Sequence, residues 1–411
     1  MIVVIGGGPA GFMGAITARE TRPEEPVVLL EKYQHVLRKV LVSGGGRCNL
    51  TNECHDPQEL MKHYPRGGKE LRGAFHHFGP SDTMDWFTGR GVPLKSEPDG
   101  RVFPASDSST SIVEVLRAAA YESGVEIRTC CGVESITREE NNFRIELNDG
   151  SFLTCEKVLL ATGGQTSGDG QGGLQLAAGL GHRIEPPVPS LFTFKSQDPL
   201  LYGLAGLAVG NVSVKAAGDG FPQKGIQETG PLLITHWGVS GPSILRLSAW
   251  GARFMSDAEY RFNLLVDWCP EINPNDLQAQ LIQWAESNGR KQVSHGPELQ
   301  IPRRMWEALL EKVDVPRDRK WAELGKKSRN SLIEALKATD MVVYGKTVNK
   351  EEFVTCGGVR LKEVNFKTME SRVVPGLFFA GEVLDIDGIT GGFNFQNCWT
   401  TGFLAGKGIL S

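Results

Sequence analysis

Residues 1–20 read MIVVIGGGPAGFMGAITARE, and four apolar residues in this stretch run directly into three consecutive glycines. Such a start has two interpretations, a secretion signal or a strand that turns sharply into a helix. A secretion signal needs cationic residues before its apolar run, whereas this run follows Met1 directly and is soon interrupted by glycine. The run IVVI is typical of a short parallel strand buried on both faces. We therefore expect a strand, a tight turn and a helix that reaches about Glu20.

The glycines after this strand have the spacing G-x-G-x-x-G. In this pattern the first glycine allows the tight turn, the second lets the backbone approach a pyrophosphate, and the third lets the helix pack against the strand. The helix N-terminus adds N–H groups and a positive dipole end. The pattern predicts that a dinucleotide pyrophosphate binds at Gly6, Gly8, Pro9, Ala10 and Gly11.

A second apolar run, PVVLLEK at residues 26–32, is expected to form the next strand. It places Glu31 twenty residues beyond Gly11. An acidic side chain at this distance accepts hydrogen bonds from the ribose of a bound dinucleotide. The alternative interpretation of Glu31 is a solvated strand end. Lys32 follows at the same edge of the predicted sheet.

Length and composition indicate a globular protein of two or three domains, with 411 residues of which 40% are hydrophobic. The net charge of -4 and the absence of a long basic run favour a small-molecule partner over nucleic acid or a membrane. No apolar stretch is long enough for a membrane span. The 8 cysteines include no C-x-x-C pair, which favours reduced thiols and a cytoplasmic protein.

Strands from both ends of the chain are expected in one sheet. Residues 125–164 read as a β-rich stretch with turns at EENN and NDGS, and they end in the buried strand and glycine turn KVLLATGG. Near the C-terminus, GLFFAGEVLD at 376–385 reads as a further buried strand, and a glycine-rich segment then leads into a last helix. We therefore expect an α/β dinucleotide-binding domain built from residues 1–186 and 355–411.

The region between these two parts has a different pattern and is expected to determine substrate specificity. Residues 187–270 alternate apolar and polar side chains, as antiparallel strands of a barrel or sandwich do. Residues 271–340 show helical periodicity and predict a small helical subdomain, and residues 341–354 form a return strand. The charged stretch VPRDRKWAELGKKSRN at 315–330 is interpreted as a solvated face, or secondarily as a docking patch for an acidic partner.

Several motifs together resemble one family of bacterial flavoproteins. They are ATGG at 161–164, FAGE at 379–382, RKVLVSGGGRCNLTN at 38–52, THWGVSGP at 235–242, TCGGV at 355–359 and GEVLDIDGITGGFNFQ at 381–396. They are similar to the YhiN/BaiN-type, aminoacetone-oxidase family of the two-dinucleotide-binding flavoproteins. Cys356 replaces the more usual alanine of that family, and Phe393 stands where tyrosine is also common.

The resemblance implies a Rossmann-like FAD-binding domain of the GR2 type, with an inserted β-rich, barrel-like domain that carries the helical subdomain. It also implies non-covalent FAD. The residues expected at the cofactor, besides the glycine loop and Glu31, are Lys32, Lys39, Gly45, Gly46, Arg47, Cys48, Asn49, Val133, Ala161, Thr162, Gly163, Gly164, Gly381, Glu382, Gly391, Gly392, Phe393 and Asn394.

The glycine-rich motifs have a physical interpretation of their own. The three consecutive glycines of SGGGRCN let the backbone lie close to a flat ring or a phosphate, and Arg47 offsets negative charge beside them. Lys39 is interpreted either as neutralising the pyrophosphate or as solvated. The N–H groups of Gly392, Phe393 and Asn394 are expected at the N1–C2=O edge of the flavin, where reduction places negative charge. The alternative is that this segment only closes the sheet and packs the last helix.

Two catalytic candidates follow, Arg47 and His236. His236 lies in a shaped turn between apolar runs, and the alternative is a partly buried histidine bonded to backbone. No metal site is predicted, because adjacent His76 and His77 do not share a face and Cys54 and His55 lack companions at ligand spacing. Glu382 is expected at the ribityl or phosphate side of the cofactor.

A single dinucleotide fingerprint is present, so no separate NAD(P)H-binding domain is expected. Either an organic substrate such as an amine reduces the flavin, or NAD(P)H visits transiently and the flavin reduces an acceptor such as an activated double bond. In both cases a hydride moves to or from flavin N5, in a dry pocket expected between the two domains. The alternative function is FAD binding for a structural or redox-sensing role without turnover. The sequence leaves the oligomeric state open.

Overall fold

The computed structural model describes residues 1–164, 172–347 and 354–410. The chain forms two compact units: unit 1 is Met1–Pro189 with Asn349–Ser411, and unit 2 is Ser190–Val348. The expected domain boundaries were 186/187 and 354/355. Part of the predicted return strand, residues 348–353, lies outside the described residues.

Unit 1 is organised around a seven-stranded sheet with the order β20-β21-β22-β10-β1-β2-β6. Its centre consists of parallel strands, namely β6 (Glu126–Arg128), β2 (Val27–Leu30), β1 (Ile2–Ile5), β10 (Lys157–Leu160) and β22 (Leu377–Phe379). The short strands β20 (Val364–Asn365) and β21 (Glu370–Ser371) add an antiparallel edge. Strands β1 and β2 are buried along their whole length, which explains their unbroken apolar sequence. The prediction that both chain ends share one sheet is confirmed.

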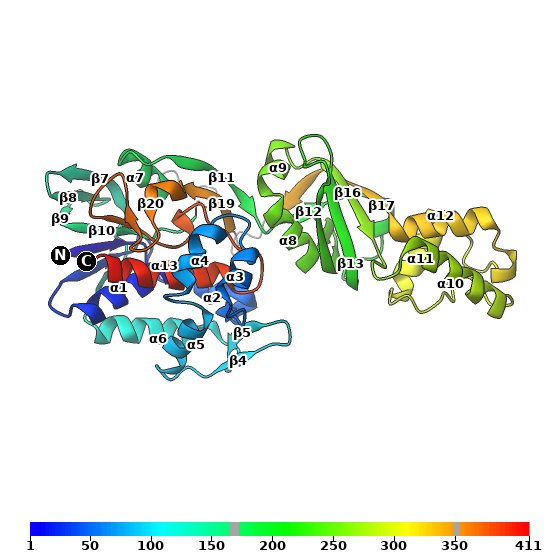
Figure 1. Cartoon of the computed structure of the whole chain (residues 1–411), viewed down its shortest axis with the longest axis horizontal. Helices are drawn as coiled ribbons and strands as arrows, with labels where there is room; N and C mark the ends of the chain where they lie inside the picture. Colours follow the sequence, from blue (N-terminus) through cyan, green and yellow to red (C-terminus); the bar gives the residue numbers. More distant parts are fainter. Residues whose placement is uncertain (165–171, 348–353, 411) are drawn as a thin grey trace. The chain divides into compact units, whose positions relative to one another are not determined.

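Helices α1 (Pro9–Thr21) and α13 (Phe393–Gly408) lie side by side over this sheet (Figure 1). Glycines make this close approach possible. A Cβ atom on Gly402 would lie 2.6 Å from the carbonyl oxygen of Ala10, and one on Gly406 would lie 2.6 Å from that of Gly14. The first and last helices of the chain are therefore packed backbone against backbone, with the start of α1 beside the middle of α13.

The remaining elements of unit 1 surround this sheet. Two smaller sheets are formed by β3 (Thr51–Asn52), β5 (Arg101–Pro104) and β4 (Leu94–Ser96), and by β7 (Val133–Glu139), β8 (Asn142–Leu147) and β9 (Phe152–Cys155). Strands β11 (Ile184–Ser190) and β19 (Val354–Val359) pair with each other. The helices are α2 (Arg38–Gly46), α3 (Pro57–Leu60), α4 (Gly68–Phe75), α5 (Pro80–Thr88), α6 (Ser109–Glu122) and α7 (Gly173–Gly179). A 3-10 turn, η5 (Gly381–Val383), follows β22.

Unit 2 contains a second seven-stranded sheet with the order β17-β16-β13-β14-β15-β12-β18. Its strands are β12 (Thr193–Lys195), β13 (Ala208–Ala217), β14 (Ile226–Thr235), β15 (Gly238–Ser240), β16 (Phe262–Asp267), β17 (Thr339–Val343) and β18 (Gly345–Thr347). Only Tyr344 separates β17 at one end of this order from β18 at the other. The sheet therefore closes on itself, as expected for a barrel-like insertion.

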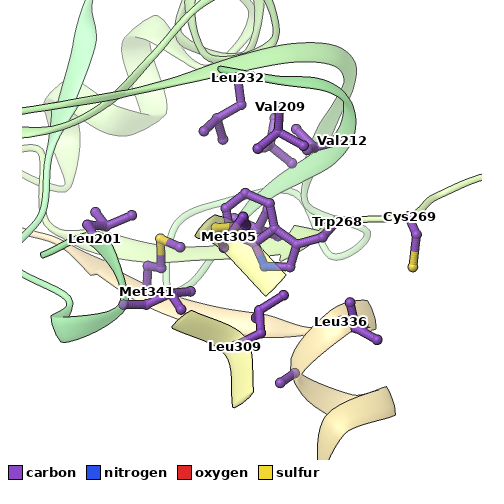
Figure 2. Close-up of a cluster of buried hydrophobic side chains, with 14 of the residues drawn as sticks. Leu201, Val209, Val212, Leu232, Trp268, Cys269, Met305, Leu309, Leu336 and Met341 are labelled. Atoms are coloured by element: carbon purple, nitrogen blue, oxygen red, sulfur yellow. The ribbon is translucent and has the colours of Figure 1, made fainter. Parts of the chain in front are cut away.

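Five helices accompany this sheet, namely α8 (Pro242–Trp250), α9 (Ala252–Asp257), α10 (Pro274–Ser287), α11 (Arg303–Lys312) and α12 (Lys326–Lys337). The last three lie where the sequence periodicity predicts helices. Figure 2 shows Met305 and Leu309 of α11 and Leu336 of α12 directed toward Trp268 and Met341 of the barrel strands and their connections. The helical part therefore shares one hydrophobic core with the barrel.

Candidate flavin site

The glycine loop between β1 and α1 combines tight packing with an open side. Gly6 has φ +114, and a Cβ atom there would collide with the carbonyl oxygen of Ala161. A Cβ atom on Gly11 would collide with the carbonyl oxygen of Gly6. By contrast, a Cβ atom on Gly8 would meet no protein atom within 4 Å. Gly6 and Gly11 are therefore required by packing within the protein. Gly8 instead leaves space in front of the N-terminus of α1, whose first residues are Pro9 and Ala10.

Glu31 lies beside this loop at the end of β2. Its carboxylate accepts hydrogen bonds from the N–H of Gly7 and from the N–H of Tyr33, each at 2.9 Å. The residue is half-buried, which fits a carboxylate belonging to the site better than a solvated strand end. Lys32 is exposed, and its ammonium lies 4.8 Å from the centre of the Tyr33 ring.

The SGGG sequence forms a left-handed turn at the end of α2. Gly44, Gly45 and Gly46 have φ values of +57, +68 and +84, which side chains disfavour. Cβ atoms at Gly45 and Gly46 would meet no protein atom within 4 Å. This backbone therefore faces open space, as a surface that contacts a flat ring or a phosphate requires.

Lys39 and Glu382, both predicted at the cofactor, contact each other. The Lys39 ammonium lies 2.7 Å from a carboxylate oxygen of Glu382, so α2 is joined to η5 across the chain. Burial by itself lowers the pKa of Lys39, but the attraction and hydrogen bond from Glu382 outweigh it, and the pKa is raised above its ordinary value. Lys39 is therefore charged and compensates the carboxylate of Glu382, which is 9% exposed.

Arg47 is engaged by carboxylates of the neighbouring sheet. Its guanidinium lies 2.6 Å from an oxygen of Glu97 and 2.8 Å from one of Asp107, and it covers the Phe103 ring at 4.0 Å. The hydrogen bonds to Glu97 and Asp107 raise the pKa of Arg47. These contacts fix the residue that follows the left-handed glycine turn. The next residue, Cys48, is buried with φ +61, and burial raises the pKa of its thiol to about 12.

The segment before α13 is held by two asparagines. In the amide orientation that satisfies both partners, Asn49 accepts from the Gly392 N–H at 3.0 Å and donates to the Thr51 carbonyl at 3.1 Å. Asn394 accepts from the Gly388 N–H at 2.8 Å and donates to the Gly388 carbonyl at 2.9 Å. The Gly392 N–H expected to face the flavin is therefore bonded to Asn49. The N–H groups of Phe393 and Asn394 lie in the first turn of α13, where amides have no intrahelical partner.

The remaining predicted contacts fall on three other segments of unit 1. Ala161 is buried and its N–H is bonded to the Ile5 carbonyl at 2.9 Å. Thr162 has a buried hydroxyl without a partner among the described residues, and Gly163 has φ +77 with open space at its Cβ position. A Cβ atom on Gly164 would collide with the Thr355 side chain. Val133 begins β7, Gly381 has φ +76 and Gly391 has φ +132.

Several residues of this region carried no recognised sequence signal. The Tyr64 hydroxyl donates to the Phe393 carbonyl at 2.7 Å, and the buried Gln396 accepts from the hydroxyls of Thr51 and Thr83. Arg66 forms a bidentate ion pair with the fully buried Asp387. Gln396 and Asp387 lie inside the quoted GEVLDIDGITGGFNFQ motif, which could have identified them. Tyr64 and Arg66 stand in no comparable pattern.

His236 lies in unit 2, in the turn between β14 and β15. It is exposed, and its ring makes no hydrogen bond to any part of the chain that the structure describes. The alternative of a partly buried histidine bonded to backbone is therefore wrong. Its neighbour Trp237 is 45% exposed.

A family model, described as the HI0933-like protein Rossmann domain, matches residues 1–408. The chain belongs to this HI0933-like family. The expected YhiN/BaiN-type flavoprotein is thereby confirmed, and so is the Rossmann-like FAD-binding fold.

Curated relatives match the HI0933-like chain over nearly its whole length. The 3-dehydro-bile acid delta(4,6)-reductase of Clostridium scindens is 30% identical over 409 residues, which cover 99% of this chain and 98% of the relative. The ribosomal RNA dihydrouridine synthase of Escherichia coli is 30% identical over 418 residues, which cover 100% and 98%. A solved structure, the 3-ketosteroid-delta4-(5alpha)-dehydrogenase of Rhodococcus jostii, shares the fold with a TM-score of 0.51 at 14% identity, covering 98% of this chain and 96% of that one.

These findings identify the HI0933-like chain as a flavin-dependent oxidoreductase. The site also fits a flavin dinucleotide, because the Cβ positions of Gly8, Gly45, Gly46 and Gly163 open into space that the protein does not fill. Within residues 1–164, 172–347 and 354–410, no helix is long and apolar enough to cross a membrane. In the same part of the chain, no group of three or more metal-binding side chains comes together.

Proposed function

We propose that the protein reduces a carbon–carbon double bond conjugated to a carbonyl group, with NAD(P)H as the electron donor and non-covalently bound FAD as the carrier. The observation that supports this proposal most is the chemistry shared by two relatives of equal identity. A bile-acid delta(4,6)-reductase and a dihydrouridine synthase have different substrates. Both are named for saturating a double bond that is conjugated to a carbonyl.

The overall reaction consumes one NAD(P)H and one proton. A hydride adds to the carbon β to the carbonyl, a proton adds to the α carbon, and NAD(P)⁺ is released. Bound FAD would supply the hydride chemistry at N5. The eight cysteines are all free thiols, which agrees with a reducing cytoplasmic setting in which NAD(P)H is available.

The residues of unit 1 would bind and orient the cofactor. The α1 N-terminus with the open position of Gly8 would hold the pyrophosphate, and Glu31 would accept hydrogen bonds from the ribose. The Lys39–Glu382 pair would present a compensated carboxylate to the ribityl or phosphate side. The first-turn amides of Phe393 and Asn394 would stabilise negative charge on the ring.

His236 and Arg47 are the proposed catalytic residues. The exposed imidazole of His236 would donate the proton to the α carbon. Arg47 would act through position and charge, because Glu97 and Asp107 hold its guanidinium beside the glycine turn. His236→Phe is expected to lower kcat with double-bond substrates at least tenfold, while the rate of flavin reduction by NAD(P)H stays unchanged.

Anaerobic absorbance spectroscopy of the holoprotein tests the proposal. NADH or NADPH is expected to bleach the flavin band, and an enone such as a 3-keto-4-ene steroid, or a uridine-containing substrate, is expected to restore it. Restoration only by oxygen, after bleaching by amines and not by NAD(P)H, would indicate an amine oxidase instead. A flavin band that no donor bleaches would indicate a structural or sensing flavoprotein.

A further inference from the structure

Two neighbouring cysteines lie next to the predicted ribose site of unit 1. Cys130 and Cys131 follow strand β6 after Thr129, and both are free thiols. Cys130 is exposed and Cys131 is partly buried. The function proposed above uses neither thiol. They are therefore a pair of accessible nucleophiles without an assigned role.

The other cysteines offer no comparable pair, and the structure describes all eight of them. Cys54 is partly accessible, but no other cysteine adjoins it in the sequence. Burial and the nearby carboxylates of Glu59 and Asp56 raise the pKa of Cys54, which lowers its thiolate fraction. The remaining five are buried, namely Cys48, Cys155, Cys269, Cys356 and Cys398. Two adjacent thiols within reach of solvent therefore occur at one place, directly after β6.

The backbone of the two cysteines holds the segment that carries Glu31. The Cys131 N–H donates to the Glu31 carbonyl at 2.8 Å, and the Cys130 N–H donates to the Tyr33 carbonyl at 3.1 Å. The Glu31 N–H donates in turn to the Arg128 carbonyl at 2.9 Å. These three backbone hydrogen bonds join the end of β2 to the end of β6, and the cysteines donate two of them.

The side chain of Glu31 depends on this backbone. Its carboxylate accepts hydrogen bonds from the N–H of Gly7 in the glycine loop and from the N–H of Tyr33, each at 2.9 Å. Tyr33 belongs to the segment that the cysteines hold. A displacement of this segment therefore moves the carboxylate that is predicted to accept hydrogen bonds from the ribose.

A disulfide between adjacent cysteines requires a change in the same backbone. The Cα atoms of neighbouring residues are about 3.8 Å apart, whereas those of an ordinary disulfide are about 4.4–6.8 Å apart. Bridging the two sulfurs therefore distorts the peptide group between Cys130 and Cys131. That peptide group carries the N–H that donates to the Glu31 carbonyl. An exposed disulfide with distorted geometry is also readily reduced, as a reversible modification requires.

We propose that Cys130 and Cys131 form a modification site at which hydrogen peroxide joins the two sulfurs in a disulfide, and that the modified protein binds FAD more weakly. The exposed Cys130 thiol attacks the peroxide and becomes a sulfenic acid, with release of one water. The Cys131 thiol then attacks the Cys130 sulfur, which forms the S–S bond and releases a second water. In total, two thiols lose two electrons and two protons, and one peroxide becomes two waters.

This inference goes beyond the proposed function and rests on one part of it, the assignment of the FAD ribose to Glu31. In a reducing compartment a disulfide of this kind is transient and suits redox sensing. The loss of the hydrogen bonds from the cysteine backbone would then couple the oxidation state of the pair to the amount of FAD that the protein retains.

Peroxide treatment of the full-length holoprotein tests the proposal with two measurements. Mass spectrometry of the peptide that contains both cysteines detects the loss of two hydrogen atoms. Serial dilution of the holoprotein, with flavin fluorescence reporting released FAD, gives the Kd for FAD. The test variants are Cys130→Ser and Cys131→Ser, each of which leaves one thiol of the pair. The matched control is Cys54→Ser, which removes the other accessible thiol and keeps the pair.

Oxidised wild type is expected to have a Kd for FAD at least about fivefold larger than reduced wild type, because two hydrogen bonds that position Glu31 are disturbed. Dithiothreitol is expected to restore both the mass and the Kd. Each test variant is expected to keep the Kd of reduced wild type before and after peroxide, and Cys54→Ser is expected to respond as wild type does.

Three results would overturn the inference: no disulfide in peroxide-treated wild type, a disulfide that leaves the Kd unchanged, or equal weakening in the two test variants. Loss of the response in Cys54→Ser would also overturn it, because the reactive thiol would then lie elsewhere. Neither measurement depends on turnover. Failure of NAD(P)H or an enone to act on the flavin is therefore distinguishable from failure of the modification site.

Discussion

Gly8 and Gly11 belong to one sequence pattern but have different surroundings. Gly8 has φ -89, an ordinary value for any residue, and its Cβ position is open. Gly11 has no such space, because a Cβ atom there would collide with the Gly6 carbonyl oxygen. Gly11 is therefore needed by the fold, whereas the fold by itself leaves room for a side chain at Gly8.

Substitution separates these two requirements. Gly8→Val is expected to weaken FAD binding at least tenfold while the thermal stability of the FAD-free protein stays within about 0.5 kcal/mol of wild type, because the new side chain meets no protein atom. Gly11→Ala is expected to destabilise the FAD-free protein by about 1–3 kcal/mol through overpacking. Titration with FAD and urea unfolding of the FAD-free protein measure the two effects. Wild-type FAD affinity in Gly8→Val would contradict the pyrophosphate assignment.

At the level of elements, the start of α13 is fixed by side chains from two other segments. Asn49 bonds the Gly392 N–H, and Tyr64 bonds the Phe393 carbonyl. Gly392 has φ +92, and any Cβ atom there would collide with the Thr51 carbonyl oxygen. Gly392→Pro would therefore disrupt the fold, so it is unsuitable as a probe of the flavin environment.

Asn394→Ala is the better probe of this element. The substitution removes both hydrogen bonds to Gly388 and loosens the α13 N-terminus, so we expect the flavin reduction potential to fall by about 6–43 mV. This range follows from about 0.3–2 kcal/mol for a helix N-terminus near an anion and about 30 mV per 1.4 kcal/mol. Spectroelectrochemical titration measures it. A loss of thermal stability with an unchanged potential would show that the segment only closes the sheet and packs the helix.

At the scale of the whole molecule, all predicted FAD contacts fall in unit 1, whereas unit 2 has a hydrophobic core of its own. That core joins the barrel to α10, α11 and α12 through buried side chains such as Leu309 and Trp268 (Figure 2). Deleting the helical part would therefore expose the core of the barrel, and a single cavity-forming substitution perturbs unit 2 more cleanly.

Leu309→Ala is expected to destabilise unit 2 by about 2–5 kcal/mol, because the side chain is fully buried in its core. Flavin fluorescence reports the release of FAD from unit 1, and tryptophan fluorescence reports mainly the unfolding of unit 2, which holds six of the chain's eight tryptophans. We expect the second transition to move to lower temperature while FAD release stays at its wild-type temperature. Parallel shifts of both transitions would show that FAD binding depends on the folded state of unit 2.

The sequence by itself determined the features that depend on local pattern. Unbroken apolar runs identify β1, β2 and β10 because strands buried on both faces admit no polar side chain, and glycine spacing identifies the α1 N-terminus because only glycine fits beside Ala161 and Gly6. Only the tertiary structure decided which distant residues meet. It joined Lys39 to Glu382 and bonded Asn49 to Gly392. These partners are hundreds of residues apart in the sequence. Local periodicity predicts single helices and strands, but it does not predict which distant segments pack together.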